Sequence, residues 1–123
     1  FKMSMNDIIL IKDVSHYTFD FKSLFEKNNS IIWKNCHDIS INIDNKINKM
    51  IFNNCYNITV ICNHLVSGIE YFKCKNIIQN ISDNNQINCL DLYHTDISIN
   101  IHDIKKIPVI IKEKSLVYIN KID

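Results

Sequence analysis

The chain has 123 residues and a formal net charge of +1, a size that fits one domain over residues 1–123. Lysines and acidic residues are interspersed, which argues against nucleic acid as a partner because polyanions are bound by concentrated basic charge. No apolar run could span a bilayer, and five cysteines without a Cys-x-x-Cys pair favour free thiols in a reducing compartment. We therefore expect a cytoplasmic protein with no nucleic-acid or membrane partner.

A four-residue phrase recurs along the chain with a nearly constant step. Its clearest copies begin at Cys36, Cys55 and Cys74, which are 19 residues apart (55 − 36 and 74 − 55). The six copies occupy residues 14–17, 36–39, 55–58, 74–77, 94–97 and 113–116. A short fixed period is typical of a solenoid, in which each repeat buries its apolar face only against its neighbours. The repeat therefore predicts about six coils.

Apolar and polar residues alternate after each phrase, and this period of two predicts β-strands. The alternation is plain in 17–21, 39–43 and 97–101, and a second short apolar strand precedes the phrase at 31–33, 50–52, 69–72, 89–92 and 109–111. The segment 22–30 lengthens one step and is predicted to be an inserted loop or a helical turn. Two or three strands per coil of about 19 residues predict an all-β fold, a single-domain right-handed parallel β-helix.

The third position of the phrase carries Asp38, Asn57, Asn76 and Asp96. Asp and Asn tolerate left-handed backbone and bond their own main chain, and stacked amides bond one another. This position therefore predicts a ladder of corner residues.

The first position carries Cys36, Cys55 and Cys74, which predicts an inward column of small buried side chains. Metal binding and redox chemistry are the alternatives, but metal ligands must converge on one point and a column does not. We expect neither a metal site nor a cofactor. Gln79 falls in an inward frame, so either its amide is buried and bonded or the strand carries a bulge.

The ends of a coil stack expose unpaired strands and need protection. The aromatic first coil could be covered by residues 3–10, whereas the apolar strand 116–119 has no evident cap. We expect this C-terminal edge to pair with a second copy, giving a homodimer, or with further sequence.

The histidines, residues 16, 37, 64, 94 and 102, form no recognisable motif with a nearby acid. Cys36 and His37 are neighbours in sequence, so on a strand or corner their side chains diverge and cannot act as a nucleophile and its base. Glycine occurs once, so there is no Gly-rich phosphate loop. These patterns predict a protein that is not an enzyme.

Two stretches, 48–55 (NKMIFNNC) and 65–77 (LVSGIEYFKCKNI), resemble the C-terminal β-helix (CARP) domain of cyclase-associated proteins. The match spans roughly residues 45–101, and the superfamily includes tubulin cofactor C. The resemblance implies a cytoskeletal regulator that binds the actin monomer, promotes exchange of its nucleotide and dimerises through strands at its C-terminal end.

Glu70, Lys73 and Lys75 are outward charged residues in the matched coil and are our candidates for binding a protein partner, although a solvated charged face is the alternative. No counterpart of the family's later Ser-Ser strand and acidic tail is found here. A structural or oligomerisation module without actin activity is therefore a second hypothesis. A binder of tubulin or a small GTPase is a third, and the absence of arginine excludes GTPase activation by an arginine finger.

Overall fold

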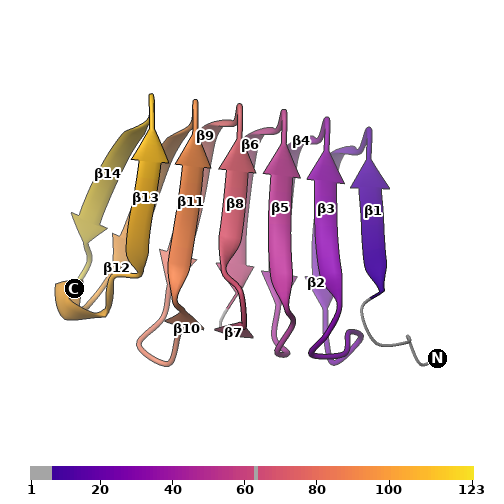
Figure 1. Cartoon of the computed structure of the whole chain (residues 1–123), viewed down its shortest axis with the longest axis horizontal. Coiled ribbons are helices and arrows are strands. Elements are labelled where there is room, and N and C mark those ends of the chain that lie inside the picture. The colour runs from indigo at the N-terminus through magenta and orange to yellow at the C-terminus, as the bar shows by residue number, and fades with distance from the viewer. Residues whose placement is uncertain (1–6, 63) are drawn as a thin grey trace.

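The computed structural model describes residues 7–62 and 64–123 and confirms a parallel β-helix of six coils (Figure 1). The front sheet contains β1 (Ile8–Lys12), β3 (Ser30–Lys34), β5 (Lys49–Asn53), β8 (Ile69–Phe72), β11 (Cys89–Tyr93) and β13 (Val109–Glu113). The back sheet contains β2 (Ser15–Phe21), β4 (His37–Ile43), β6 (Tyr56–Cys62), β9 (Lys75–Ile81), β12 (Asp96–Ile101) and β14 (Leu116–Lys121).

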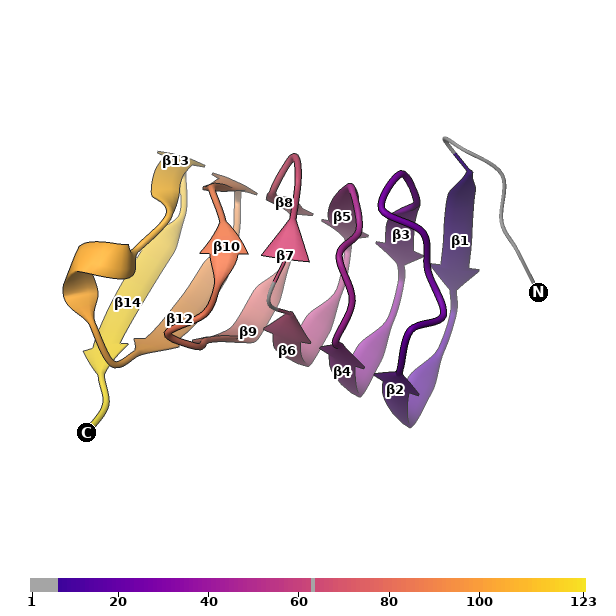
Figure 2. The same cartoon turned by 90° about the horizontal axis from the view of Figure 1, so that it is seen from below.

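A short third side appears in the middle coils, where β7 (His64–Leu65) pairs with β10 (Gln86–Ile87), as Figure 2 shows from below. A 3-10 turn, Ile104–Lys106, precedes β13. Within the described residues no helix combines the length and apolarity needed to cross a membrane. The predicted count of two or three strands per coil is therefore confirmed.

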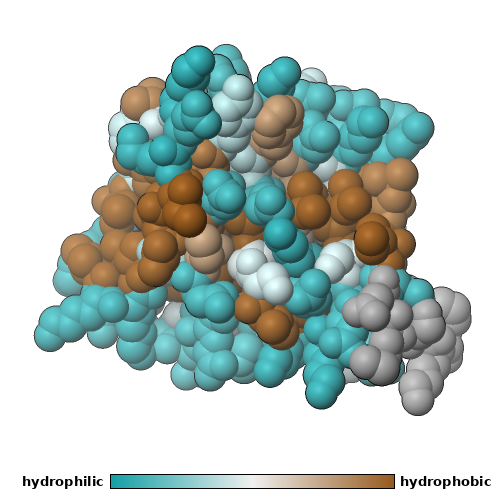
Figure 3. All heavy atoms as spheres, viewed as in Figure 1, coloured by the Kyte–Doolittle hydropathy of each residue, from teal (hydrophilic) through white to brown (hydrophobic). Residues whose placement is uncertain are grey.

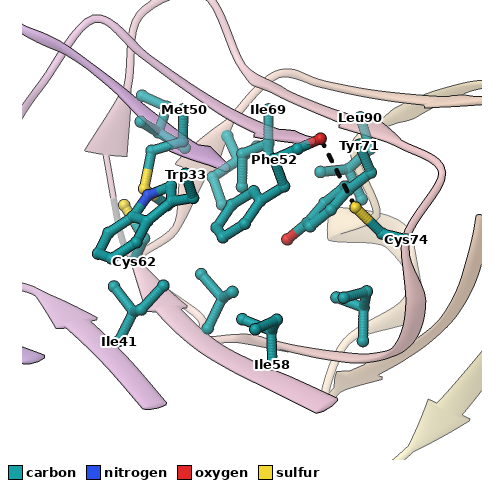
Figure 4. Close-up of a cluster of buried hydrophobic side chains, with 14 of the residues drawn as sticks. Trp33, Ile41, Met50, Phe52, Ile58, Cys62, Ile69, Tyr71, Cys74 and Leu90 are labelled. Carbon is teal, nitrogen blue, oxygen red and sulfur yellow. Dashed lines mark hydrogen bonds between the residues drawn. The ribbon is translucent and has the colours of Figure 1, made fainter. Parts of the chain in front are cut away.

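Each strand pairs in parallel with the equivalent strand of the next coil, so equivalent side chains stack in columns. Trp33 pairs with Phe52 and Phe52 with Tyr71, and all three side chains lie in the core (Figure 4). Their rings stack at centroid distances of 5.9 and 4.8 Å. Burying each such side chain contributes about 1.5–3 kcal/mol, and stacked rings add to it. The inward columns thus hold the two sheets together.

The cysteine column is confirmed. Cys36, Cys55 and Cys74 are at most 1% exposed. The Cys55 thiol donates to the carbonyl of Trp33 at 3.5 Å, and the Cys74 thiol donates to that of Phe52 at 3.6 Å (Figure 4). Each thiol therefore satisfies a backbone acceptor of the preceding coil.

The predicted alignment of the repeat is wrong in the last two coils. It placed His94 and Glu113 at the position that cysteine occupies in the second to fourth coils. Thr95 and Ser115 occupy that position instead: Cys74 N–H donates to Thr95 Oγ1 at 3.3 Å, and Thr95 N–H donates to Ser115 Oγ at 2.9 Å. Phe72 pairs with Tyr93 and Ile77 with Ile97, so residues 73–76 form the fourth corner but only 94–96 form the fifth. The corner is one residue shorter there, which shifts the phrase.

The corner ladder is confirmed for Asp38, Asn57 and Asn76, whose φ angles are 54°, 56° and 53°. Asn57 Nδ2 donates to Asp38 Oδ1 at 3.0 Å, and Asn76 Nδ2 donates to Asn57 Oδ1 at 2.5 Å. Asp96 does not belong to it: this residue begins β12 and has no positive φ, because the shorter corner removes the left-handed residue.

A second left-handed column runs through all six coils just before the cysteine position. Its members have φ between 48° and 59° and are Asp13, Asn35, Asn54, Lys73, His94 and Lys114. Non-glycine residues adopt this conformation infrequently, so a column of six indicates that the corner geometry is imposed by the stack.

Gln79 is fully buried and pairs regularly with Val60 and Ile99, so the strand has no bulge here. Its Oε1 accepts a hydrogen bond from the Tyr71 hydroxyl, while its Nε2 has no partner among the described residues. Of the two alternatives predicted for Gln79, a buried and bonded amide or a bulged strand, the first is therefore correct, although only the oxygen of the amide is bonded.

The expectation that residues 3–10 could cover the first coil is wrong for residues 8–10. They lie in β1, which pairs in parallel with β3 as the first strand of the stack, because Ile9 and Ile11 face inward. Residues 3–6 lie outside the described residues. The insertion at 22–29 is a loop rather than a helical turn, and its Phe25 is buried against Phe21.

Candidate functional site

A basic hollow lies at the corner between the front and back sheets in the last three coils. It has a volume of about 360 Å³ and is lined by Lys73, Lys75, His94, Asp96 and Lys114. Asp96 is the single acidic residue in this lining as far as the structure describes it. We call this feature the corner hollow.

The corner hollow is built by the left-handed column. Lys73, His94 and Lys114 have φ angles of 55°, 48° and 50° and follow one another in successive coils, which are about 4.8 Å apart. Their backbone is fixed because Lys73 N–H donates to Tyr93 O at 2.9 Å and His94 N–H donates to Glu113 O at 3.0 Å. Two lysines and a histidine thus project in one row from a rigid backbone.

Lys75 extends this surface toward the third coil. It begins β9, pairs with Tyr56, and together with Lys73 lines a second, smaller hollow beside Asn54. Lys73 and Lys75 are both exposed. The structure therefore brings these two predicted site residues together.

Glu70 does not join the corner hollow. It lies in the middle of β8, on the outer face of the front sheet, where its carboxylate is 2.6 Å from Lys49 Nζ. Such a half-exposed ion pair contributes about 0.2–1 kcal/mol. Of the three residues proposed from sequence, Glu70 is the one that the strand geometry places on a different face.

The outer face of the front sheet carries a band of apolar side chains, which Figure 3 shows interrupted by polar ones in the middle coils. One row of this face contains Leu10, Ile32, Ile51, Glu70, Asp91 and Ile111. Beside it, the rings of Phe72 and Tyr93 stack at 4.8 Å, and Lys73 Nζ lies 5.3 Å from the Phe72 ring centroid. This cation–π contact connects the aromatic pair to the corner hollow.

Sequence reasoning missed His94, Lys114 and the aromatic pair. The missing information was the register: until the corner is known to shorten, nothing in the sequence aligns Lys73 with His94 and Lys114. The sequence did contain one signal for the left-handed column. Asn35 and Asn54 each directly precede a cysteine, and asparagine tolerates the left-handed backbone that both residues adopt.

One histidine does pair with an acid, contrary to the expectation from sequence. Nδ1 of His37 lies 2.7 Å from Oδ2 of Asp38. The pKa of the Asp38 carboxyl is lowered by its hydrogen bond with His37 and by the one that it accepts from Asn57.

The side chains of Cys36 and His37 diverge as predicted, because Cys36 is buried while His37 is half-buried. Burial also raises the pKa of the Cys36 thiol.

The comparison with protein families matches residues 14–91 to the adenylate cyclase associated (CAP) C terminal family. The matched stretch is more than half of the chain, and it runs from the first corner to the middle of β11, including Lys73 and Lys75. The comparison with individual curated proteins found no match. The fold, the corner ladders and this match agree, and the chain therefore belongs to the family of the adenylate cyclase associated protein C-terminal domain.

Proposed function

We propose that this chain is a non-enzymatic domain that binds the actin monomer in the cytoplasm and promotes exchange of its nucleotide. The observation that carries the proposal is the family match over residues 14–91, which includes Lys73 and Lys75 of the corner hollow and ends before His94, Asp96 and Lys114. The corner hollow is the contact surface that we assign to this binding.

Charge and rigidity support that assignment. The corner hollow gathers three lysines and His94 around one carboxylate, so it attracts an acidic patch on a partner, with an association rate that falls as salt rises. The neighbouring Phe72 and Tyr93 supply the large apolar rings that carry much of the energy at protein interfaces. A solenoid frame loses little conformational entropy on binding, because its backbone is already fixed.

The direct experiment measures release of a fluorescent etheno-nucleotide from monomeric actin with the folded chain in excess. We expect faster exchange that saturates with the chain. No acceleration and no binding to monomeric actin would overturn the proposal and leave the structural-module hypothesis in its place.

Variants locate the contact. Lys73→Asn and Lys75→Tyr introduce the residues that the preceding coil carries at the same positions, Asn54 and Tyr56, so the fold is retained. We expect weaker actin binding and a shallower salt dependence. Lys12→Asn and Lys34→Asn remove the same charge from the first two coils of the front sheet, where the two lysines pair. Equal weakening by both pairs of variants would mean that the corner hollow is not the contact.

We also propose a homodimer through β14. This strand ends the back sheet, and its outward Leu116 and Tyr118 are 57% and 58% exposed. An unpaired strand edge with apolar side chains is a template for pairing with another chain. Sedimentation velocity is expected to show a dimer that Tyr118→Lys, in the outward row, weakens, and a monomer at high concentration would exclude this pairing.

A further inference from the structure

A cluster of metal-ligand side chains lies at the opposite end of the same corner. His16, His37 and Asp38 each offer one donor atom, and these three atoms lie within 4.8 Å of one another. His16 and Asp38 occupy equivalent positions of the first two coils, and His37 directly precedes Asp38. The corner hollow belongs to the last three coils, so the two features are separate.

The neighbouring coil holds the ligand side chains in place. Asn57 Nδ2 donates to Asp38 Oδ1 at 3.0 Å, which leaves Oδ2 of the carboxylate facing His37. The ring of His37 stacks on Tyr56 at 4.7 Å with an interplanar angle of 3°. Partners of this kind, which orient ligands without touching the ion, are a general feature of metal sites in proteins.

The rings of the two histidines meet edge to face at a centroid distance of 5.4 Å. The φ angle is 54° at both His16 and Asp38, so the stack also fixes the backbone from which these two ligands project. His16 is exposed, whereas His37 and Asp38 are half-buried. An ion can therefore enter from solvent, and His16 has the freedom to turn toward it.

We propose that His16, His37 and Asp38 form a binding site for a divalent transition metal ion, with Zn²⁺ as the best fit. Two imidazoles and one carboxylate are ligands that zinc accepts, and a zinc ion with three protein ligands completes its shell with water. Zinc–ligand bonds of 2.0–2.1 Å place tetrahedral donors roughly 3.4 Å apart. Closing the site therefore takes a rotation of the exposed His16 toward the other two ligands and a widening of the 2.7 Å contact between His37 Nδ1 and Asp38 Oδ2, whose hydrogen bond is replaced by the two bonds to zinc. Calcium and magnesium prefer shells of oxygen and are not expected to bind here.

Isothermal titration of the tag-free, reduced full chain with zinc chloride tests the site. We expect saturable binding of one ion per chain and an increase in melting temperature with zinc, because a ligand that binds only the folded state stabilises it. Cobalt(II) is expected to give the visible absorption of a low-symmetry nitrogen–oxygen site. No saturable binding of zinc would overturn the proposal.

Three variants use residues that the ladders already accommodate. Asp38→Asn and His16→Asn introduce the residue found at Asn57, and His37→Tyr introduces that of Tyr56, so each variant is expected to fold. Each is expected to weaken zinc binding at least about tenfold. His102→Gln removes an exposed histidine elsewhere and is expected to leave zinc binding unchanged. Undiminished affinity in the three variants, with native circular dichroism, would assign the zinc to other groups and refute the site.

Discussion

The hydroxyl of Tyr71 donates a 2.6 Å hydrogen bond to Oε1 of Gln79 in the interior of the β-helix. The first residue comes from β8 and the second from β9, so the bond joins the front sheet to the back sheet within one coil. Burial raises the pKa of the Tyr71 hydroxyl well above its ordinary value, which keeps this group protonated as a donor. Neighbouring coils fill the two columns with Phe52, Val60 and Ile99, which cannot make such a bond.

A double-mutant cycle follows from this pair. Tyr71→Phe is expected to lower the free energy of unfolding by about 1–3 kcal/mol, because it leaves the amide of Gln79 buried without a partner. Tyr71→Phe combined with Gln79→Val takes both residues from neighbouring coils, and replacing both polar groups is expected to recover most of the loss. Urea unfolding measures all four corners of the cycle, and strictly additive effects would contradict a shared hydrogen bond.

Thr95 is expected to need its hydroxyl rather than its methyl group. Its Oγ1 donates to Tyr93 O at 3.0 Å and accepts from Cys74 N–H at 3.3 Å in the core. Thr95→Val keeps the shape but leaves the buried Cys74 N–H without its acceptor, whereas Tyr93 O keeps the bond from Lys73 N–H. This loss is expected to cost about 1–3 kcal/mol of stability by urea unfolding. Thr95→Ser keeps the hydroxyl and is the control. If the two variants were equally stable, the hydroxyl would not be a member of the cysteine column.

The period of the cysteines and the alternation of isoleucines predicted the architecture, because a coil can bury these residues only in one register. Ile39, Ile41 and Ile43 face inward as the pattern requires. The same pattern could not reveal the shortened corner, since Thr95 satisfies backbone groups much as Cys74 does and leaves no gap in the apolar alternation.

The candidate sites were predictable only in part. Lys73 and Lys75 meet because they flank Cys74 within one corner, which their proximity in the sequence shows. His94 and Lys114 join them through stacking across coils, which depends on the register. The contact between His37 and Asp38 depends on side-chain rotation at a left-handed corner, and no motif encodes that rotation.

The buried thiols of Cys36 and Cys55 are expected to react slowly in the native state. The hydrogen bond with the Cys74 thiol, together with burial, raises the pKa of Cys55, and burial raises that of Cys36, so little thiolate forms at neutral pH. Cys89 is half-buried and is expected to react first with Ellman's reagent. Mass spectrometry of partly modified protein identifies the site, and denaturant is expected to release all five thiols. Early labelling of Cys55 in folded protein would contradict its buried position.

Gly68, the single glycine of the chain, is expected to tolerate no side chain. Its φ angle is 87°, and a Cβ atom built there would lie 2.3 Å from the carbonyl oxygen of Cys89 in the next coil. Gly68→Ala combines left-handed strain with this overlap against backbone, so we expect at least about 2 kcal/mol of destabilisation in urea unfolding.

Ser67→Ala is the control for Gly68→Ala, because it changes the adjacent exposed residue, whose Oγ donates to Asn48 Oδ1 at 2.8 Å. A loss of about 1 kcal/mol or less is expected for it. The carbonyl of Gly68 accepts from Met50 N–H at 3.3 Å, so any shift that relieves the overlap with Cys89 also disturbs the pairing with the preceding coil. If Gly68→Ala were as stable as Ser67→Ala, the turn at Gly68 could move without breaking its contact with Met50 or with Cys89. That result would contradict the close stacking of the third to fifth coils.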